Sequence, residues 1–135
     1  MKKILIIGAG AMGSAFSIPC AENNNDVTII GSVLENDFIS SIKSNKNLHP
    51  SLNIILPSNI KIEKFEKISS ATDKNLDLIV VAVSSVGIDW VGDEISKFYL
   101  ANTPIILLTK GLSIIDDQLT TLTEKLEMIL KKKWQ

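Results

Sequence analysis

Three glycines near the start of the sequence have the spacing of a loop that binds phosphate. Gly8, Gly10 and Gly13 follow the apolar run of residues 4–7 and open a segment of small residues. The first glycine permits a tight turn, the second lets a phosphate approach the backbone, and the third lets a helix pack closely against a strand. The amides at the start of such a helix face the phosphates, where the helix dipole favours negative charge. We therefore expect the pyrophosphate of a dinucleotide to bind between Gly8 and Gly13.

The adenosine end of such a dinucleotide is predicted to lie near Ser32. This residue follows the second apolar run, at the distance from Gly10 where an Asp or Glu would bind the ribose hydroxyls of NAD. Because Ser32 is uncharged, it would not repel the 2′-phosphate of NADP, but all 14 basic residues are lysines and no arginine is present to bind that phosphate. Glu35 is interpreted as a cap of the next helix. The sequence admits NAD or NADP and leans toward NADP.

Polar residues also follow two later apolar runs, where the carboxyl ends of parallel strands collect ligands. Ser84 and Ser85 are candidates to hydrogen-bond the phosphates or ribose of the cofactor, with helix capping as the alternative. Lys110 is a candidate to bind an anionic substrate or the cofactor, with a solvated surface lysine as the alternative. His49, the one histidine of the chain, is interpreted as structural or solvated rather than catalytic.

The composition argues against several other functions. One cysteine, Cys20, and one histidine do not make a zinc site, so no metal ligands are predicted. The net charge of −1 gives no reason to expect a nucleic acid as partner. No apolar run reaches the length of a membrane span, and the run before Gly8 is too short for a signal peptide. We therefore expect a cytoplasmic protein.

The remaining pattern predicts the elements that must position these residues. Short apolar runs rich in β-branched residues predict five strands, at residues 3–7, 27–30, 60–62, 78–83 and 105–108. Helical patterns predict five helices, at residues 11–22, 35–44, 64–70, 86–100 and 117–132. Residues 45–59, which contain two prolines, are predicted to be irregular. The alternation predicts a single α/β domain, a Rossmann-type doubly wound parallel sheet in three α/β/α layers.

Over essentially the whole chain, these motifs resemble the N-terminal domain of NAD(P)-dependent glycerol-3-phosphate dehydrogenases. The resemblance rests on the glycine loop through Ala15, residues 27–31, His49-Pro50 with Leu56-Pro57, Val83-Ser84-Ser85 and Thr109-Lys110-Gly111-Leu112. In that family the residues between the second and third glycines contact the cofactor, which implies contacts for Ala11 and Met12. The resemblance also implies that Ser32 binds the cofactor, and that Lys110 reaches both cofactor and substrate.

The resemblance implies an oxidoreductase that exchanges a hydride between dihydroxyacetone phosphate, a small phosphorylated substrate, and sn-glycerol 3-phosphate. A homodimer is one possible assembly of the full-length enzyme. The family's principal catalytic lysine belongs to a helical C-terminal domain that is not found in residues 1–135. This chain is therefore expected to be the NAD(P)-binding domain, without catalytic residues of its own, and to turn over little or nothing by itself. It departs from the family at Val83, often a proline, and at Met12, commonly aromatic.

Two alternatives remain open. A ketopantoate-reductase-like domain also favours a Gly-Ala-Gly-Ala-Met-Gly loop, but it would be expected to carry an Asn-Gly near the end of the fifth strand, where this chain has Lys110-Gly111. A nucleotide-sensing module without a catalytic partner domain would need the same loop and no substrate site.

Overall fold

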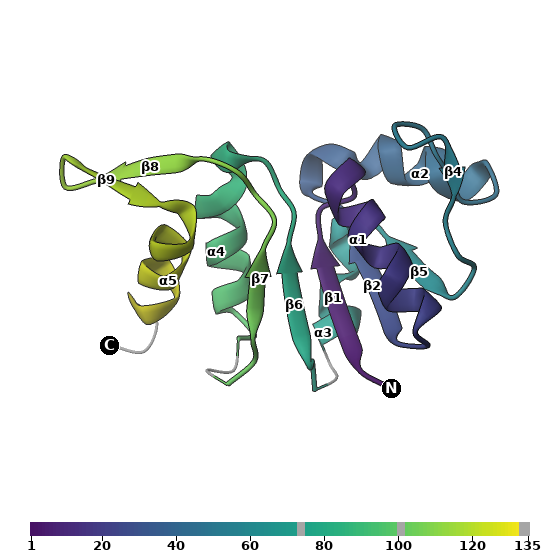
Figure 1. Ribbon diagram of the computed structural model, residues 1–135, viewed down its shortest axis with the longest axis horizontal. Coiled ribbons are helices and arrows are strands. Elements are labelled where there is room, and N and C mark those ends of the chain that lie inside the picture. Colours follow the sequence, from purple (N-terminus) through teal and green to yellow (C-terminus); the bar gives the residue numbers. More distant parts are fainter. Residues whose placement is uncertain (73–74, 100–101, 133–135) are drawn as a thin grey trace.

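A computed structural model describes residues 1–72, 75–99 and 102–132, and its centre is a five-stranded parallel sheet (Figure 1). The sheet order is β5-β2-β1-β6-β7. The direction in which successive strands are added reverses between β1 and β6, which is the switch point of a Rossmann fold. The predicted fold is confirmed. The strands are β1 (Lys3–Ile7), β2 (Asp26–Ile30), β5 (Ile60–Glu63), β6 (Leu78–Val81) and β7 (Ile105–Leu107).

Helices cover both faces of this sheet and make the three predicted layers. Successive side chains of β1 point to opposite faces, yet Ile6 and Ile7 are both fully buried. Ile6 packs with residues of the first two helices and Ile7 with residues of the last three. Burial on both faces explains why the strands read as continuous apolar runs. The first two helices are α1 (Ala11–Glu22) and α2 (Asn36–Ser44), and the last three are α3 (Ile68–Thr72), α4 (Ile88–Ser96) and α5 (Leu122–Lys132).

Helix α1 matches its prediction to the residue, because local signals define both ends. Gly10 is its N-cap, in an extended conformation. At the other end the side-chain amide of Asn23 donates to the carbonyl of Pro19 at 2.7 Å, and Asn24 adopts a left-handed φ of 62°. Asparagine tolerates that conformation better than most residues, so it ends the helix there.

The segment between α2 and β5 contains a short hairpin that the sequence did not predict. Residues 45–59 were expected to be irregular, but β3 (Leu48–His49) and β4 (Ile54–Ile55) form an antiparallel pair. Two-residue strands carry no readable alternation, so the pattern could not reveal them. The hairpin matters because it carries His49, whose side chain is fully buried.

A second hairpin replaces the start of the last predicted helix. The expectation of a helix from residue 117 was wrong at this end, because β8 (Leu112–Ile115) and β9 (Gln118–Thr121) pair before α5 begins at Leu122. The turn between them is Asp116-Asp117, with φ of 50° and 62°. Two left-handed residues make the turn type of tight hairpins, which Asn-Gly or Asp-Gly usually signals. Asp-Asp is a weaker signal.

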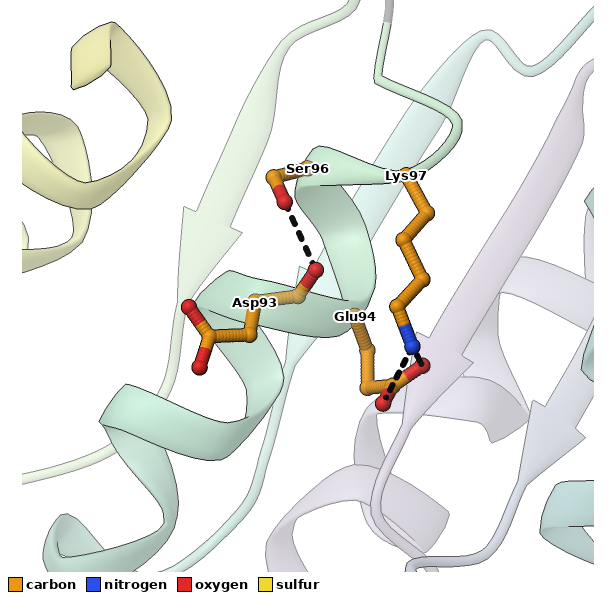
Figure 2. Close-up of polar contacts among 4 residues, drawn as sticks. All are labelled: Asp93, Glu94, Ser96 and Lys97. Atoms are coloured by element: carbon orange, nitrogen blue, oxygen red, sulfur yellow. Dashed lines mark hydrogen bonds and ion pairs between the residues drawn. The ribbon is translucent and has the colours of Figure 1, made fainter. Parts of the chain in front are cut away.

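Two further helices are shorter than predicted, each beginning with a 3-10 turn. Residues Phe65–Lys67 precede α3, and Ser85–Gly87 precede α4. Figure 2 shows the last turn of α4, where the hydroxyl of Ser96 donates to the carbonyl of Asp93 at 2.7 Å and Lys97 reaches both carboxylate oxygens of Glu94 at 2.9 Å. The predicted end of this helix, residue 100, lies outside the described residues.

Candidate dinucleotide site

The loop after β1 is built so that glycine is required at two of its three positions. Gly8 has a φ of 113°, and a Cβ placed there would lie 2.4 Å from the carbonyl oxygen of Ala82. Its N–H donates to the carbonyl of Ile30 at 2.8 Å, which ties the end of β1 to the end of β2. A Cβ on Gly13 would lie 2.5 Å from the carbonyl oxygen of Gly8. Gly8 and Gly13 therefore serve the tight turn and the close helix–strand packing predicted for them.

Gly10 differs, because nothing fills the space beside it. A Cβ placed on Gly10 would meet no atom within 4 Å. The first backbone bond of α1 runs from the N–H of Ser14 to the carbonyl of Gly10 at 3.1 Å, so the amides of Ala11, Met12 and Gly13 belong to the open helix end. Ala11 and Met12 are exposed. Open space beside a row of helix N-terminal amides is the shape that a pyrophosphate needs.

An acidic side chain lies at the tip of β2, contrary to the sequence-based argument about this position. Ser32 itself is uncharged, but Glu35 turns back so that its carboxylate accepts from the N–H of Ser32 at 2.8 Å. The same carboxylate accepts from the N–H of Ala9 in the glycine loop at 3.2 Å. Glu35 does cap the following turn, as interpreted, but it also places a negative charge where the adenosine ribose of a dinucleotide would bind.

His49 lies underneath the same loop. Its side chain is fully buried, and its Nε2 is 2.9 Å from the carbonyl oxygen of Ala9. Of the two interpretations given to this residue, burial excludes the solvated one. The sequence could not show the contact with Ala9, because the two residues are 40 positions apart.

The carboxyl ends of β6 and β7 bring the remaining predicted residues into one region. Ser84 precedes a 3-10 turn without making a side-chain capping hydrogen bond, and it is exposed. The hydroxyl of Thr109 donates to the carbonyl of Val83 at 2.6 Å and fixes the neighbouring Lys110, which is exposed. A Cβ on Gly111 would lie 3.6 Å from the Cβ of Ser85, so the two strand ends are in contact. Serine hydroxyls and a lysine ammonium are thus placed on the same edge as the glycine loop.

Exposed apolar side chains also line this edge, a feature that the sequence analysis did not identify. Leu34 is 92% exposed and Val86 is 90% exposed, and Met12 and Val33 are about half exposed. They follow β1, β2 and β6, the strands that meet at the switch point. Large apolar residues in loops that follow such strands are the signal that would have identified them. Such surfaces are suited to covering the flat faces of aromatic rings.

The described residues also bear on other kinds of site. No group of three His, Cys, Asp or Glu side chains is arranged to hold a metal ion in residues 1–72, 75–99 and 102–132. In that same part of the chain, every helix is too short or too polar to cross a membrane. Two cavities, of about 340 and 450 Å³, lie beside α3 and α5, and the glycine loop lines neither of them.

Known proteins resemble the chain in both sequence and structure. An archaeal relative, the NADP(+)-dependent glycerol-3-phosphate dehydrogenase of Archaeoglobus fulgidus, is 33% identical over 121 residues, which are 90% of this chain and 35% of the relative. The glycerol-3-phosphate dehydrogenase of Plasmodium falciparum superposes with a TM-score of 0.76 at 24% identity, covering 96% of this chain and 38% of that one. A putative 2-dehydropantoate 2-reductase from Enterococcus faecalis superposes less well, with a TM-score of 0.66 at 26% identity, covering 98% and 37% of the two chains.

A family model also matches the chain. The model described as the NAD-dependent glycerol-3-phosphate dehydrogenase N-terminus matches residues 3–135, nearly the whole chain. The chain spans little more than a third of the relatives' length. The glycine loop and the strand order agree with this match. The chain belongs to the family of glycerol-3-phosphate dehydrogenase N-terminal domains.

Proposed function

We propose that this chain is the dinucleotide-binding part of a glycerol-3-phosphate dehydrogenase, an enzyme that interconverts dihydroxyacetone phosphate and sn-glycerol 3-phosphate. The observation that carries the proposal is the open space at Gly10, where a Cβ would meet no atom within 4 Å beside the free end of α1. The family match and the dehydrogenase names of the relatives supply the reaction. The cofactor, when bound, would supply the hydride in its reduced form and accept it in its oxidised form.

The residues present fit the pyrophosphate, the adenosine ribose and the adenine of such a cofactor. The amides of Ala11 and Met12 would receive the pyrophosphate, since they begin α1 and are exposed. Ser32 and Glu35 would lie beside the adenosine ribose. Leu34, almost fully exposed, would cover a face of the adenine. The pyrophosphate role belongs to the segment after β1, and the ribose and adenine roles belong to the segment after β2, on the same edge of the sheet.

Lys110 would act toward both the cofactor and the substrate. Its ammonium is exposed at the end of β7, and its ε-amino group is a strong donor to the phosphate or carbonyl oxygen of dihydroxyacetone phosphate. The Thr109 hydroxyl holds the backbone of this strand end against Val83. Ser84 would donate to the cofactor from the neighbouring strand end. These residues bind and orient the reactants, so no proton-transfer step is assigned to them.

The proposal includes both nicotinamide cofactors, NAD and NADP. The name of the Archaeoglobus relative is NADP-dependent, in agreement with the preference inferred from the sequence, and other relatives are named for NAD(P). The carboxylate of Glu35 removes one argument behind that preference, because it places a like charge near the 2′-phosphate. The balance between the cofactors therefore depends on Glu35.

We further propose that residues 1–135 bind the cofactor but reduce little or no dihydroxyacetone phosphate by themselves. The relatives are nearly three times as long as the segment that matches this chain, leaving room for a separate substrate domain in those proteins. The proposal also includes a cytoplasmic location, a homodimeric full-length enzyme and no nucleic-acid partner, in keeping with the net charge of −1. Steady-state reduction of dihydroxyacetone phosphate by the 135-residue chain would contradict the first of these statements.

Fluorescence titration with NADH and NADPH tests the binding proposal. The wild-type chain is expected to bind at least one of them. Gly10→Val is expected to fold with only a small loss of thermal stability, because no atom lies beside Gly10, but to lose at least about tenfold in affinity, because the valine side chain enters the phosphate space. Thr123→Val, on the exposed surface of α5, is the matched control and should bind as the wild type does. Normal binding by a folded Gly10→Val variant would overturn the assigned site.

A further inference from the structure

The peptide groups on both sides of the Ala9 Cα are held by side chains from elsewhere in the chain. The N–H of Ala9 donates to the carboxylate of Glu35 at 3.2 Å. The carbonyl of Ala9 accepts from the hydroxyl of Ser14 at 3.0 Å and lies 2.9 Å from Nε2 of His49. Ala9 stands between the turn glycine and Gly10, so these contacts act on the one stretch of loop that must present its backbone to the phosphates.

The hydrogen bonds of His49 define its tautomer. The N–H of Leu52 donates to Nδ1 of His49 at 3.2 Å, so Nδ1 accepts and carries no hydrogen. The carbonyl of Ala9 can only accept, so Nε2 carries the hydrogen and donates it. The imidazole is therefore neutral. Its Nδ1 accepts a hydrogen bond within its own hairpin, and its Nε2–H donates one to the glycine loop.

The surroundings of His49 leave the ring little freedom. It is fully buried, and the ring of Phe38 from α2 meets it edge-on at a centroid distance of 5.2 Å. The backbone carbonyl of His49 accepts from the N–H of Asn53 at 2.8 Å, which fixes the hairpin that carries it. A buried imidazole without partners would be costly, and both of its nitrogens have one here. The ring therefore connects the hairpin to the glycine loop through its two hydrogen bonds.

We propose that His49 is a positioning residue for the cofactor. Its Nε2–H holds the Ala9 carbonyl and thereby fixes the backbone before Gly10, so that the amides of α1 stand ready for the pyrophosphate before the ligand arrives. Preorganisation of this kind increases affinity without a new contact to the ligand. The inference rests on the proposed dinucleotide function, and it adds a residue that touches neither cofactor nor substrate.

Two substitutions separate the two nitrogens of the ring. In His49→Gln the side-chain nitrogen lies as many bonds from Cα as Nε2 does, so it can still donate to Ala9, while the acceptor for Leu52 is lost. In His49→Asn the side-chain oxygen matches Nδ1, so it can still accept from Leu52, while the donor to Ala9 is lost. If His49 only stabilised the fold, both substitutions should reduce the affinity for the dinucleotide about equally.

The experiment compares both variants with the wild type in two measurements. Fluorescence titration with NADH and NADPH gives the affinity, and the amide NMR signals of Ala9 and Gly10 in the ligand-free chain report the loop directly. His49→Asn is expected to lose about three- to tenfold in affinity, the range for one hydrogen bond, and to shift or broaden both signals. His49→Gln is expected to keep most of the affinity and to leave the signals near their wild-type positions.

The other outcomes are equally informative. If wild type and both variants bind alike, or both variants lose affinity equally, the positioning role is overturned and the proposed function stands. If the wild-type chain binds neither dinucleotide, the proposed function fails and the inference falls with it. Should His49→Asn not fold, Ser14→Ala removes the second donor to the Ala9 carbonyl without touching the hairpin. A loss of about threefold is then expected, and unchanged affinity overturns the inference.

Discussion

The hydroxyl of Thr109 donates to the carbonyl of Val83 across the ends of two neighbouring parallel strands, at 2.6 Å. The bond fixes the backbone on which Lys110 follows β7 to the backbone on which Ser84 follows β6. The lysine is exposed, but the chain around it is held. A cation on an anchored strand end loses less freedom when it binds an anion than one in a mobile loop.

Lys110→Met is therefore expected to weaken NADH binding by about three- to tenfold at low salt, the range for losing one charged hydrogen bond that remains partly hydrated. Titrations at increasing salt should bring the wild-type affinity down toward that of the variant. Lys132→Met, an exposed lysine at the far end of α5, is the matched control and should bind as the wild type does. Equal loss in both lysine variants would indicate a general charge effect and would contradict a specific contact.

Glu35→Gln is expected to raise the affinity for NADPH relative to NADH by about fivefold, because it removes a like charge near the 2′-phosphate. Oε1 of Glu35 accepts from the amides of Ser32 and Ala9, at 2.8 and 3.3 Å, so a glutamine oxygen in its place can still accept from both. Asp37→Asn removes the same charge from an exposed position two residues further on and should leave the ratio unchanged. The ratio of the two dissociation constants is the measurement, and an unaltered ratio in Glu35→Gln would place the 2′-phosphate elsewhere.

Gly13→Ala and Gly10→Ala form a matched pair for stability. The added Cβ at Gly13 would lie 2.5 Å from the Gly8 carbonyl oxygen and 2.9 Å from the Ala82 Cβ, so α1 must move away from the sheet. Overpacking of this kind costs about 1–3 kcal/mol. Gly10→Ala meets no neighbouring atom and should change stability by less than about 1 kcal/mol. Urea unfolding followed by circular dichroism measures both, and equal stabilities would show that the contact between α1 and the sheet is not tight.

The start of α5 gives a pH prediction. The hydroxyl of Thr120, and then the amide of Thr121, hold the pKa of Glu124 below its ordinary value. A lowered native-state pKa stabilises the fold above the ordinary glutamate value of about 4.3, and this stabilisation is lost as the pH falls through the lowered value. The wild type should therefore be more stable than Glu124→Gln at about pH 7, and the difference should shrink toward about pH 3. Glu127→Gln, one turn further along, is the control. A difference that does not change with pH would contradict the proposed role of the hydrogen bonds from Thr120 and Thr121 to Glu124.

The parallel strands, the first helix and the glycine loop could be predicted from the sequence. The five parallel strands were found because burial on both faces demands continuous β-branched runs, and α1 was found to the residue because glycine and asparagine define its ends. The spacing of Gly8, Gly10 and Gly13 predicted the shape of the loop, because Gly8 and Gly13 leave no room for a side chain and Gly10 borders open space. These properties depend on single residues and their neighbours in the chain, so they can be predicted from the sequence.

Folding alone decided which distant side chains meet at that loop. Glu35 and His49 both bind Ala9, from 26 and 40 positions further along the chain, and no spacing rule joins them. The hairpin that carries His49 has strands of two residues, too short to leave a pattern, and the β8–β9 turn uses two aspartates in place of the usual glycine. Such contacts arise when elements pack on the sheet, because packing brings together groups whose separation in sequence is arbitrary. The primary structure therefore determined the strands, the first helix and the glycine loop, and the tertiary structure determined what holds that loop in place.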